Sequence, residues 1–286
     1  MSELAKPFLK WAGGKSSIAP ILIDNLPNQF NNYFEPMVGA GALFLNVIQN
    51  VDGHRKFFIG DINKDLISTY KVIKNNLSAL KIYLSKYENK YLAYKNEDRE
   101  KFFYSIRSQE PKTVVEIAAR FIFLNKTCFN GLYRVNRKGH FNVPHGKYVS
   151  PKIFDENNLN KIAILLKKVH FNTADVKTNS QLAQSNDFVY LDPPFYPISK
   201  TASFTSYTSK KFGEGEQLKL KLVIDELTKK QVYVMLSNSD HPWIIGAYQA
   251  SGYKLQIVKA RRSLSSNVSS RGKVNELVIT NYHLID

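Results

Sequence analysis

The sequence predicts an α/β fold, in which a sheet with helices is interrupted by an inserted, mostly helical segment. Two observations support this prediction. Short apolar runs of strand type alternate with helical periodicity near the start of the chain and again after about residue 166. Between these two zones, residues 63–165 show helical spacing and then a polar stretch, 130–150, punctuated by Gly, Asn and Pro. Strand–helix alternation on both sides of a helical insert is typical of a sheet with an inserted domain.

The individual elements follow from local patterns. Apolar runs of four or five residues with turn residues beside them predict strands, and apolar residues three or four positions apart predict helices. The polar stretch 130–150 is expected to form a hairpin and loop. We expect strands at 33–34, 57–59, 169–173, 188–191 and 232–236, helices at 42–48, 113–125 and 216–229, and a C-terminal antiparallel pair at 253–258 and 276–279.

Composition excludes several classes of protein. With 43% hydrophobic and 22% charged residues in 286 positions, the chain is expected to be an ordinary soluble globular protein rather than a disordered one. The one cysteine, Cys128, cannot form an internal disulfide or a Cys-rich zinc site, and the six histidines show no ligand spacing. No signal peptide and no stretch of 18 uncharged apolar residues is found. We therefore expect a cytoplasmic protein with no metal and no membrane segment.

The charge balance points to a polyanionic partner. Forty Lys and Arg against 24 Asp and Glu give a formal net charge of +16, which suggests nucleic acid first and an anionic membrane surface second. The alternative is that the basic surface only confers solubility. No acidic residue occurs between Glu116 and Asp155, whereas seven basic residues do: Arg120, Lys126, Arg134, Arg137, Lys138, Lys147 and Lys152. This uneven distribution favours nucleic acid.

The segment Gly13-Gly14-Lys15-Ser16 resembles part of a phosphate-binding P-loop but does not complete one. That motif needs a glycine five residues before the Gly-Lys pair, where this chain has Leu9. It also needs a preceding core strand, for which the upstream sequence leaves little room. A nucleoside triphosphatase is therefore rejected.

A second glycine turn follows the first expected strand. Gly39 and Gly41 supply two glycines of the dinucleotide fingerprint, but Phe44 stands where the third glycine would allow close packing of helix and strand. Asp61 lies 20 residues after Gly41, the spacing of the carboxylate that binds ribose hydroxyls in such folds. A nucleoside ligand without a pyrophosphate fits this pattern better than NAD, and a chance glycine turn with a surface aspartate is the alternative.

The tetrapeptide Asp192-Pro193-Pro194-Phe195 decides between these alternatives. It comes directly after the apolar run 188–191, so it is expected at the carboxyl end of a strand, where α/β sheets place their ligand chemistry. A carboxylate, a free carbonyl and an aromatic ring together can hold an exocyclic amino group and stack its flat ring. A rigid strand-to-loop turn without chemistry is the alternative.

Seven segments in order resemble the Dam-type DNA adenine-N6 methyltransferases. The resemblance extends over nearly the whole chain and includes the order of cofactor motif, inserted region and catalytic tetrapeptide. Phe129 and Phe195 stand where many members have tyrosine, so stacking is kept while a hydroxyl is lost. The matching segments are 10–15 (Lys-Trp-Ala-Gly-Gly-Lys), 33–36 (Tyr-Phe-Glu-Pro), 130–136 (Asn-Gly-Leu-Tyr-Arg-Val-Asn), 141–144 (Phe-Asn-Val-Pro), 192–195 (Asp-Pro-Pro-Phe), 204–207 (Phe-Thr-Ser-Tyr) and 269–273 (Ser-Ser-Arg-Gly-Lys).

The resemblance implies a fold, a domain order and a reaction. It implies a Rossmann-like methyltransferase sheet with helices on both faces and an inserted target-recognition domain that is mostly helical and carries a β-hairpin. Residues 1–62 and 166–286 would bind S-adenosyl-L-methionine and catalyse, and residues 63–165 would recognise the target. The reaction would be methyl transfer to N6 of adenine in double-stranded DNA, within GATC. The base would be flipped out of the duplex, because its amino group cannot be reached inside the stack.

Catalysis is assigned to the tetrapeptide. The Asp192 carboxylate and the Pro193 carbonyl would accept the two amino hydrogens, so that the nitrogen lone pair points at the methyl group. Pro194 would keep the segment rigid, and Phe195 would stack on the flipped adenine. Such a reaction depends mainly on positioning and electrostatics.

The cofactor is assigned to residues of several expected strand ends. Gly39 and Gly41 would allow close backbone approach, and Asp61 would bind the ribose hydroxyls. The resemblance adds other residues, of which three aromatic rings, those of Trp11, Phe171 and Phe195, could instead be core residues, with Trp11 most suited to be a wall. The added residues are Trp11, Lys15 and Glu35 near the methionine end, Asp175 near the cofactor's adenine, and Phe171 and Asp192.

DNA contacts are assigned by the resemblance together with side-chain chemistry. Arg134 suits a bidentate contact with guanine O6 and N7, although an arginine in a basic hairpin can instead neutralise a phosphate. Lys10 would read the first guanine, and Leu132 and Pro144 would contact thymine methyl groups. Phe129 would fill the space left by the flipped adenine, and Asn130 would support the neighbouring contacts or the orphaned base. Asn136 is a further candidate for a DNA contact. The phosphate-contact candidates are Lys126, Arg137, Lys138, Lys147, Arg271 and Lys273.

Two rival functions belong to other classes. A non-catalytic, sequence-specific DNA-binding protein would explain the charge and residues 130–144 but leaves the Asp192 tetrapeptide without a role. An RNA or protein-amide methyltransferase would use the tetrapeptide but not the DNA-type recognition segment. Protection of DNA beside a restriction endonuclease and a role in repair or regulation, in a bacterial or phage-infected cell near the nucleoid, are both compatible with the sequence.

Overall fold

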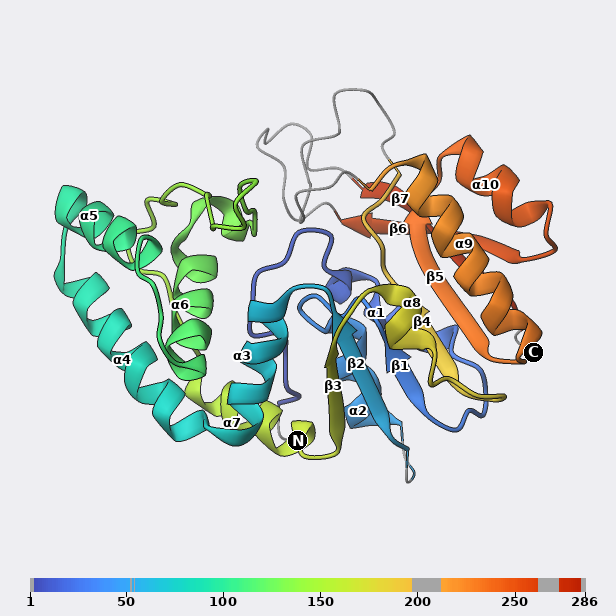
Figure 1. The fold of residues 1–286 in the computed structure, drawn as a ribbon, viewed down its shortest axis with the longest axis horizontal. Coiled ribbons are helices and arrows are strands. Elements are labelled where there is room, and N and C mark those ends of the chain that lie inside the picture. The colour runs from blue at the N-terminus through green and yellow to red at the C-terminus, as the bar shows by residue number, and fades with distance from the viewer. Residues whose placement is uncertain (1–2, 52, 54, 197–211, 262–272, 284–286) are drawn as a thin grey trace. The chain divides into compact units, whose positions relative to one another are not determined.

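The computed structural model describes residues 3–51, 53, 55–196, 212–261 and 273–283, and these form two compact units (Figure 1). The helical unit comprises Met1–Gly14, Gly39–Gly41 and Asn63–Lys168. The sheet unit comprises Lys15–Val38, Ala42–Ile62 and Val169–Asp286. Within the described part of the chain, no helix combines the length and apolarity needed to cross a bilayer.

The sheet unit contains a seven-stranded sheet in the order β3-β2-β1-β4-β5-β7-β6. Five strands are parallel, and the last two form an antiparallel pair in which β7 lies between β5 and β6. This confirms the predicted α/β sheet and the C-terminal antiparallel pair. The strands are β1 (Tyr33–Glu35), β2 (Phe57–Asp61), β3 (Val169–Thr173), β4 (Phe188–Leu191), β5 (Tyr233–Ser239), β6 (Lys254–Arg261) and β7 (Lys273–Thr280).

Helices cover both faces of the sheet, because successive residues of its central strands are apolar on both sides. Tyr33 of β1 contacts Phe57 and Phe188 on one face, where Phe44 of helix α2 also packs on Phe57. Phe34 points to the other face and joins a cluster with helices α9 and α10. The helices of this unit are α1 (Ala19–Asp24), α2 (Ala42–Asn50), α8 (Val176–Ser180), α9 (Glu214–Lys229) and α10 (Pro242–Gln249), with a 3-10 turn η1 (Lys15–Ser17) (Figure 1).

The strand order changes direction between β1 and β4. From β1 the chain passes through α2 to β2 on one side, whereas β4 lies on the other side of β1 and leads on to β5. Ligands of open α/β sheets bind outside the carboxyl ends of strands at such a switch point. Here β1 ends at Glu35 and β4 is followed directly by Asp192.

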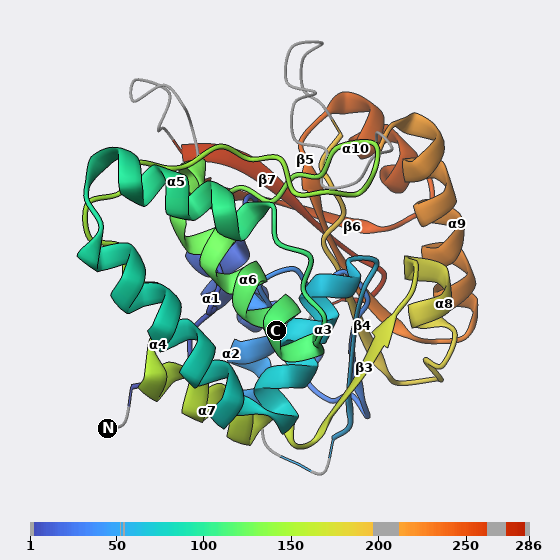
Figure 2. The same cartoon turned by 60° about the vertical axis from the view of Figure 1, so that its left-hand side comes forward.

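The helical unit is built around α6, whose apolar residues are buried from Ala118 to Leu124. Thr113 begins this helix with a reciprocal capping box to Glu116. Helices α3 and α4 pack on α6, and an aromatic core around Phe123 fills the space between α4, α5 and α6. The helices are α3 (Lys64–Asn75), α4 (Leu77–Ala93), α5 (Asn96–Arg107), α6 (Val114–Thr127) and α7 (Glu156–Leu166) (Figure 2).

The polar stretch after α6 forms the expected hairpin, but with isolated antiparallel bridges instead of regular strands. The bridges join Cys128 to His145 and Val135 to Phe141. The tip is closed by Asn136, whose side chain accepts hydrogen bonds from the backbone N–H groups of Lys138 and His140. A 3-10 turn, η2 (Phe129–Gly131), begins this hairpin segment. The expected insert, residues 63–165, lies inside Asn63–Lys168, and its role in target recognition stays a prediction.

Candidate active site

Four carboxylates gather at the switch point of the sheet unit. Glu35 ends β1 and is 3% exposed, Asp192 follows β4, and Asp61 ends β2. The charges of Asp192 and Asp61 both raise the pKa of Glu35, and that of Asp192 also raises the pKa of Glu276 on β7. In a chain with a formal net charge of +16, this acidic group is suited to a cationic ligand.

Lys15 is the cation within this group. Its side chain is 4% exposed, and its Nζ lies 2.9 Å from Asp192 Oδ1 and 3.8 Å from Glu276 Oε2. The same ammonium lies over the Phe195 ring, 4.7 Å from the centroid. Burial raises the pKa of Asp192, and the Lys15 ammonium opposes this and favours the carboxylate. The structure therefore brings Lys15 to the tetrapeptide 192–195. Contact of Lys15 with the methionine end of a cofactor stays a prediction.

Glu35 is held by two hydrogen bonds and strongly desolvated. The Tyr33 hydroxyl and the Phe44 backbone N–H donate to its carboxylate. Burial, followed by the nearby charges of Asp192 and Asp61, raises the pKa of Glu35 to about 8. At neutral pH and without a ligand the group is therefore largely protonated, and an approaching cation would favour its ionised form.

The tetrapeptide is braced by buried amides that the sequence did not reveal as site residues. Gln217 Nε2 donates to the Pro194 carbonyl (3.1 Å), and Asn238 Nδ2 donates to Gln217 Oε1 (3.0 Å). Asn238 Oδ1 in turn accepts from the Tyr196 backbone N–H. Gln217 and Asn238 are 1% and 0% exposed. The prolines and this brace together hold Asp192 and Phe195 in place from α9 and β5.

The glycine turn after β1 has the backbone that the fingerprint predicts. Gly39 and Gly41 have φ values of +50° and +70°, which favour glycine. In the helical unit, a Cβ on Gly39 would lie 2.7 Å from Trp11 Nε1, so no other residue fits there. Trp11 stacks on Tyr133, with ring centroids 5.8 Å apart. Trp11 thus packs against this turn, and its contact with a cofactor stays a prediction.

The other predicted cofactor residues occupy strand ends of the sheet unit. Asp61 and Phe171 are half-buried at the end of β2 and within β3. Asp175 is exposed and caps α8, accepting from the Thr178 backbone N–H at 2.8 Å. That hydrogen bond lowers the pKa of Asp175. Its carboxylate therefore has a structural role, and its contact with a cofactor stays a prediction.

Most of the predicted DNA-contact residues lie on the hairpin of the helical unit, and most of these are exposed. Phe129, at the start of the hairpin segment, is 44% exposed, and Asn130 beside it has φ +54°. Arg134 donates from Nε to Asn142 Oδ1 (2.8 Å) and from Nη2 to the Asn142 carbonyl (3.3 Å). These bonds restrain the guanidinium. Also exposed are Asn136, Arg137, Lys138, Pro144 and Lys147, while Leu132 is half-buried.

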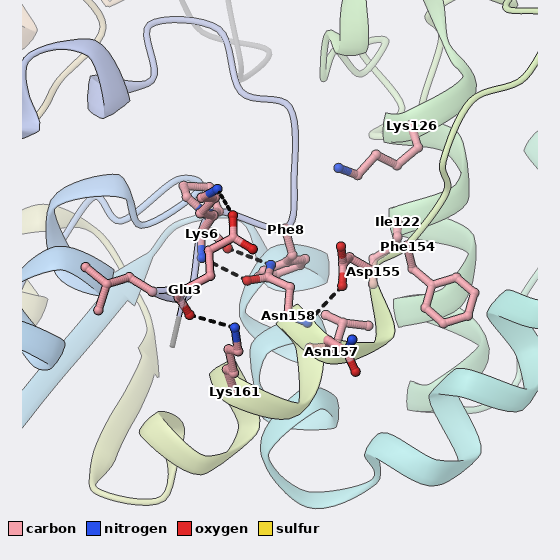
Figure 3. Close-up of a pocket in the computed structure, with 13 residues that line it drawn as sticks. Glu3, Lys6, Phe8, Ile122, Lys126, Phe154, Asp155, Asn157, Asn158 and Lys161 are labelled. Atoms are coloured by element: carbon pink, nitrogen blue, oxygen red, sulfur yellow. Dashed lines mark hydrogen bonds and ion pairs between the residues drawn. The ribbon is translucent and has the colours of Figure 1, made fainter. Parts of the chain in front are cut away.

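Two other predicted DNA contacts sit differently. Lys10 is exposed, and its ammonium lies 4.1 Å from the centroid of the Tyr148 ring. Lys126 is half-buried and points into a cavity of about 330 Å³ that Phe8 and Asp155 also line (Figure 3). Burial lowers the pKa of Lys126 to about 8, so it is a weaker candidate for a phosphate contact than an exposed lysine.

The remaining predicted residues fall outside the description. Arg271, the segment 204–207 and residues 269–272 lie outside the described residues, as does the side chain of Lys273.

Glu276, Gln217 and Asn238 are the site residues that sequence reasoning missed. Glu276 could have been noticed as an acidic residue within an otherwise apolar strand run. No local sequence pattern marks Gln217 and Asn238 as site residues. They are 21 positions apart, on α9 and β5, and only the folded structure brings them together.

Comparison with known proteins places the chain among DNA methyltransferases. Residues 11–264 match the family model of the D12 class N6 adenine-specific DNA methyltransferases. The chain is 41% identical to the type II methyltransferase M.MjaIII of Methanocaldococcus jannaschii, over 97% of this chain and 99% of that protein. It is 35% identical to the type II methyltransferase M1.LlaDCHI of Lactococcus lactis (97% and 95%) and 35% identical to the DNA adenine methylase of Vibrio cholerae (96% and 95%).

Proposed function

Because the chain belongs to the D12 class of N6 adenine-specific DNA methyltransferases, we propose that it uses S-adenosyl-L-methionine to methylate adenine within GATC. The family match confirms an adenine-specific DNA methyltransferase and sets aside the rival readings as a non-catalytic DNA-binding protein and as an RNA or protein-amide methyltransferase. The single observation that carries the cofactor proposal is the acidic group at the switch point, Glu35, Asp61, Asp192 and Glu276, with one buried lysine among them.

The residues present fit a sulfonium cofactor. When bound, this cofactor supplies a methyl group on a positively charged sulfur, beside an ammonium and a ribose. Glu35 and Asp192 would stabilise the positive charges, and Asp61 would accept hydrogen bonds from the ribose hydroxyls. Glu276 Oε2 is buried and, among the described residues, has the Lys15 ammonium 3.8 Å away but no hydrogen-bond partner, so it can accept a hydrogen bond from a bound ligand.

The role of the tetrapeptide in the chemistry follows from its acceptors. The lone pair of the exocyclic amine is delocalised into the ring, which makes the nitrogen a weak nucleophile. Asp192 and the Pro193 carbonyl would accept its two N–H groups and turn the lone pair toward the methyl group. Lys15 already occupies Asp192 Oδ1, so the second oxygen is the one available for the amine. Lys15 thereby keeps Asp192 an acceptor despite its burial.

Phe195 and the hairpin complete the proposal for the DNA. An adenine extruded from the duplex would stack on the Phe195 ring, while exposed Phe129 would fill the vacated space. Arg134 would read a guanine, with its guanidinium restrained by Asn142 before DNA arrives. Lys10 would read the other guanine of the site. Residues 1–62 and 166–286 would form the catalytic domain and residues 63–165 the target-recognition domain.

The experiment that tests the target sequence maps methylated adenines after incubation of the protein with cofactor and unmethylated genomic DNA. We expect methylation at GATC, and a different common sequence around the modified adenines would contradict the GATC proposal while leaving the N6 chemistry intact. Resistance of the methylated DNA to an endonuclease that cleaves only unmethylated GATC would confirm the target sequence by a second readout.

Arg134→Ala tests the base contact within the same assay. If Arg134 reads guanine, the variant should lose discrimination at one base pair at a cost of about 1–3 kcal/mol and keep the other positions specific. Arg137→Ala is the matched control, because Arg137 is equally exposed on the hairpin and is a predicted phosphate contact. A phosphate contact should weaken all sequences alike. Full selectivity in Arg134→Ala would contradict the assignment.

A further inference from the structure

Asn125 is a buried amide that joins two separate segments of the helical unit. It lies on α6, is 1% exposed, and follows the buried apolar residues of that helix. Its Oδ1 accepts from the Lys10 backbone N–H (2.8 Å), and its Nδ2 donates to the Lys10 carbonyl (2.7 Å). Nδ2 also donates to the Gly131 carbonyl (3.1 Å). One side chain therefore forms hydrogen bonds with the N–H and the carbonyl of Lys10 and with one carbonyl of the hairpin segment.

The side chain of Lys10 is confined by the same hairpin. Gly131 has φ +62°, and a Cβ at this position would collide with the aliphatic stem of Lys10. The ammonium at the other end lies over the Tyr148 ring, 4.1 Å from the centroid. The aliphatic stem of Lys10 thus packs against Gly131, which has no side chain to block it. The ammonium contacts the Tyr148 ring, which follows the residue, His145, that is bridged to Cys128.

Packing alone does not require an amide at this position. A leucine of similar size would fill the same space on α6 without the cost of desolvating a polar group. The amide is instead the group that can accept one hydrogen bond and donate two, and all three partners are backbone atoms of segments 115 and 6 residues away. Removing it would leave the buried Gly131 carbonyl and the partly buried N–H and carbonyl of Lys10 without their partner.

We propose that Asn125 is a positioning residue for target specificity, which locks Lys10 and the 129–132 turn into one arrangement. This inference rests on the proposed function, in which Lys10 reads one guanine and the turn carries Phe129 and Asn130. Two base-contacting segments that are far apart in sequence must keep a fixed spacing to read neighbouring base pairs. Asn125 sets that spacing without touching DNA itself.

The test compares sequence discrimination in Asn125→Leu and Asn125→Asp with wild type. Discrimination is the ratio of kcat/KM on the site that wild type methylates to kcat/KM on duplexes with one base pair changed. We expect a loss of about tenfold or more at the base pair read by Lys10, which is the scale of one lost base contact. The dissociation constant of the cofactor should stay unchanged, because its proposed carboxylates lie in the sheet unit.

Thr127→Val is the matched control on the same helix. Thr127 is 0% exposed, and its hydroxyl donates to the Phe123 carbonyl within α6, whereas its contact with the hairpin, from the Gly146 N–H, is made by the backbone carbonyl that valine keeps. This variant should lower thermal stability and keep discrimination. Asn125→Asp serves if Asn125→Leu fails to fold, because it keeps the shape and the acceptor but loses the amide donors.

Two results would overturn the proposal. One is an Asn125 variant that folds, is less stable and discriminates as wild type does, which would make the amide merely structural. The other concerns the double variant. We expect the losses of discrimination in Lys10→Ala and Asn125→Leu to be strongly non-additive, because both act through Lys10. Additive losses in the double variant would contradict the proposal. Since each ratio uses the site that wild type itself methylates, a target other than GATC would refute only the proposed sequence and not the role of Asn125.

Discussion

Replacing Glu35 by glutamine should stabilise the ligand-free protein in alkaline solution. In the unfolded chain the carboxyl group ionises near 4.5, and in the folded protein burial raises its pKa to about 8. Between these two values the folded state holds a proton that the unfolded state has lost. A rise in pH across this window therefore lowers the free energy of unfolding, and the full loss of stability is reached above pH 8.

The size of the effect follows from the two pKa values. At about 1.36 kcal/mol per pKa unit, the difference between 4.5 and 8 corresponds to a cost of about 5 kcal/mol above pH 8. Glutamine carries no such cost. We expect the two proteins to differ by about 1 kcal/mol or less at pH 5, where the folded wild type is protonated, and the variant to be more stable by about 3–5 kcal/mol at pH 9.

The assay is urea unfolding of both ligand-free proteins from pH 5 to pH 9, followed by circular dichroism. Comparing the two proteins at each pH cancels the titration of all other groups. Addition of S-adenosyl-L-methionine supplies a second readout, because a ligand stabilises only the protein that binds it. It should stabilise wild type and not the variant. A difference in unfolding free energy that is constant over the whole pH range would refute the account of Glu35.

The remaining predictions concern the cofactor and the DNA. Asp61→Ala should weaken cofactor binding by about 1–3 kcal/mol, measured by isothermal titration, through the loss of a charged hydrogen bond to ribose; an unchanged dissociation constant would show an ordinary surface acid. DNA affinity should fall steeply with salt, and Lys138→Ala should reduce the slope of log affinity against log salt by about one, equally for all sequences. A flat salt dependence would mean that the +16 charge serves something other than DNA.

Much of the sheet could be predicted, because its strands are short apolar runs with turn residues beside them. The runs at 169–173 and 188–191 coincide with β3 and β4. The run expected at 232–236 is β5, which continues to Ser239, since the polar residues Ser237 and Asn238 are buried there by their hydrogen bonds. The position of β7 between β5 and β6 could not be predicted from local sequence patterns, because strand order depends on pairing between residues far apart in the sequence.

The same distinction separates the site residues. Asp192, Glu35 and Asp61 could be proposed because each directly follows or ends a strand, and strand ends meet at the switch point. The ion pair between Lys15 and Asp192 joins residues 177 positions apart, so no local pattern contains it. Near the end of α6, Lys126 has the positive charge of a DNA contact but lies half-buried against a cavity, and charge alone does not distinguish it from an exposed lysine of the hairpin.

The most direct test of the account is a single-turnover measurement on Asp192→Ala. Labelled S-adenosyl-L-methionine and an unmethylated duplex are mixed with excess enzyme, and the products are analysed for N6-methyladenine, with cofactor and DNA dissociation constants measured in parallel. We expect rapid transfer to adenine N6 by wild type. We expect no detectable transfer by Asp192→Ala, whose binding of cofactor and DNA should be mostly intact. Near-normal turnover by this variant would contradict the role of Asp192 and, with it, the proposed mechanism.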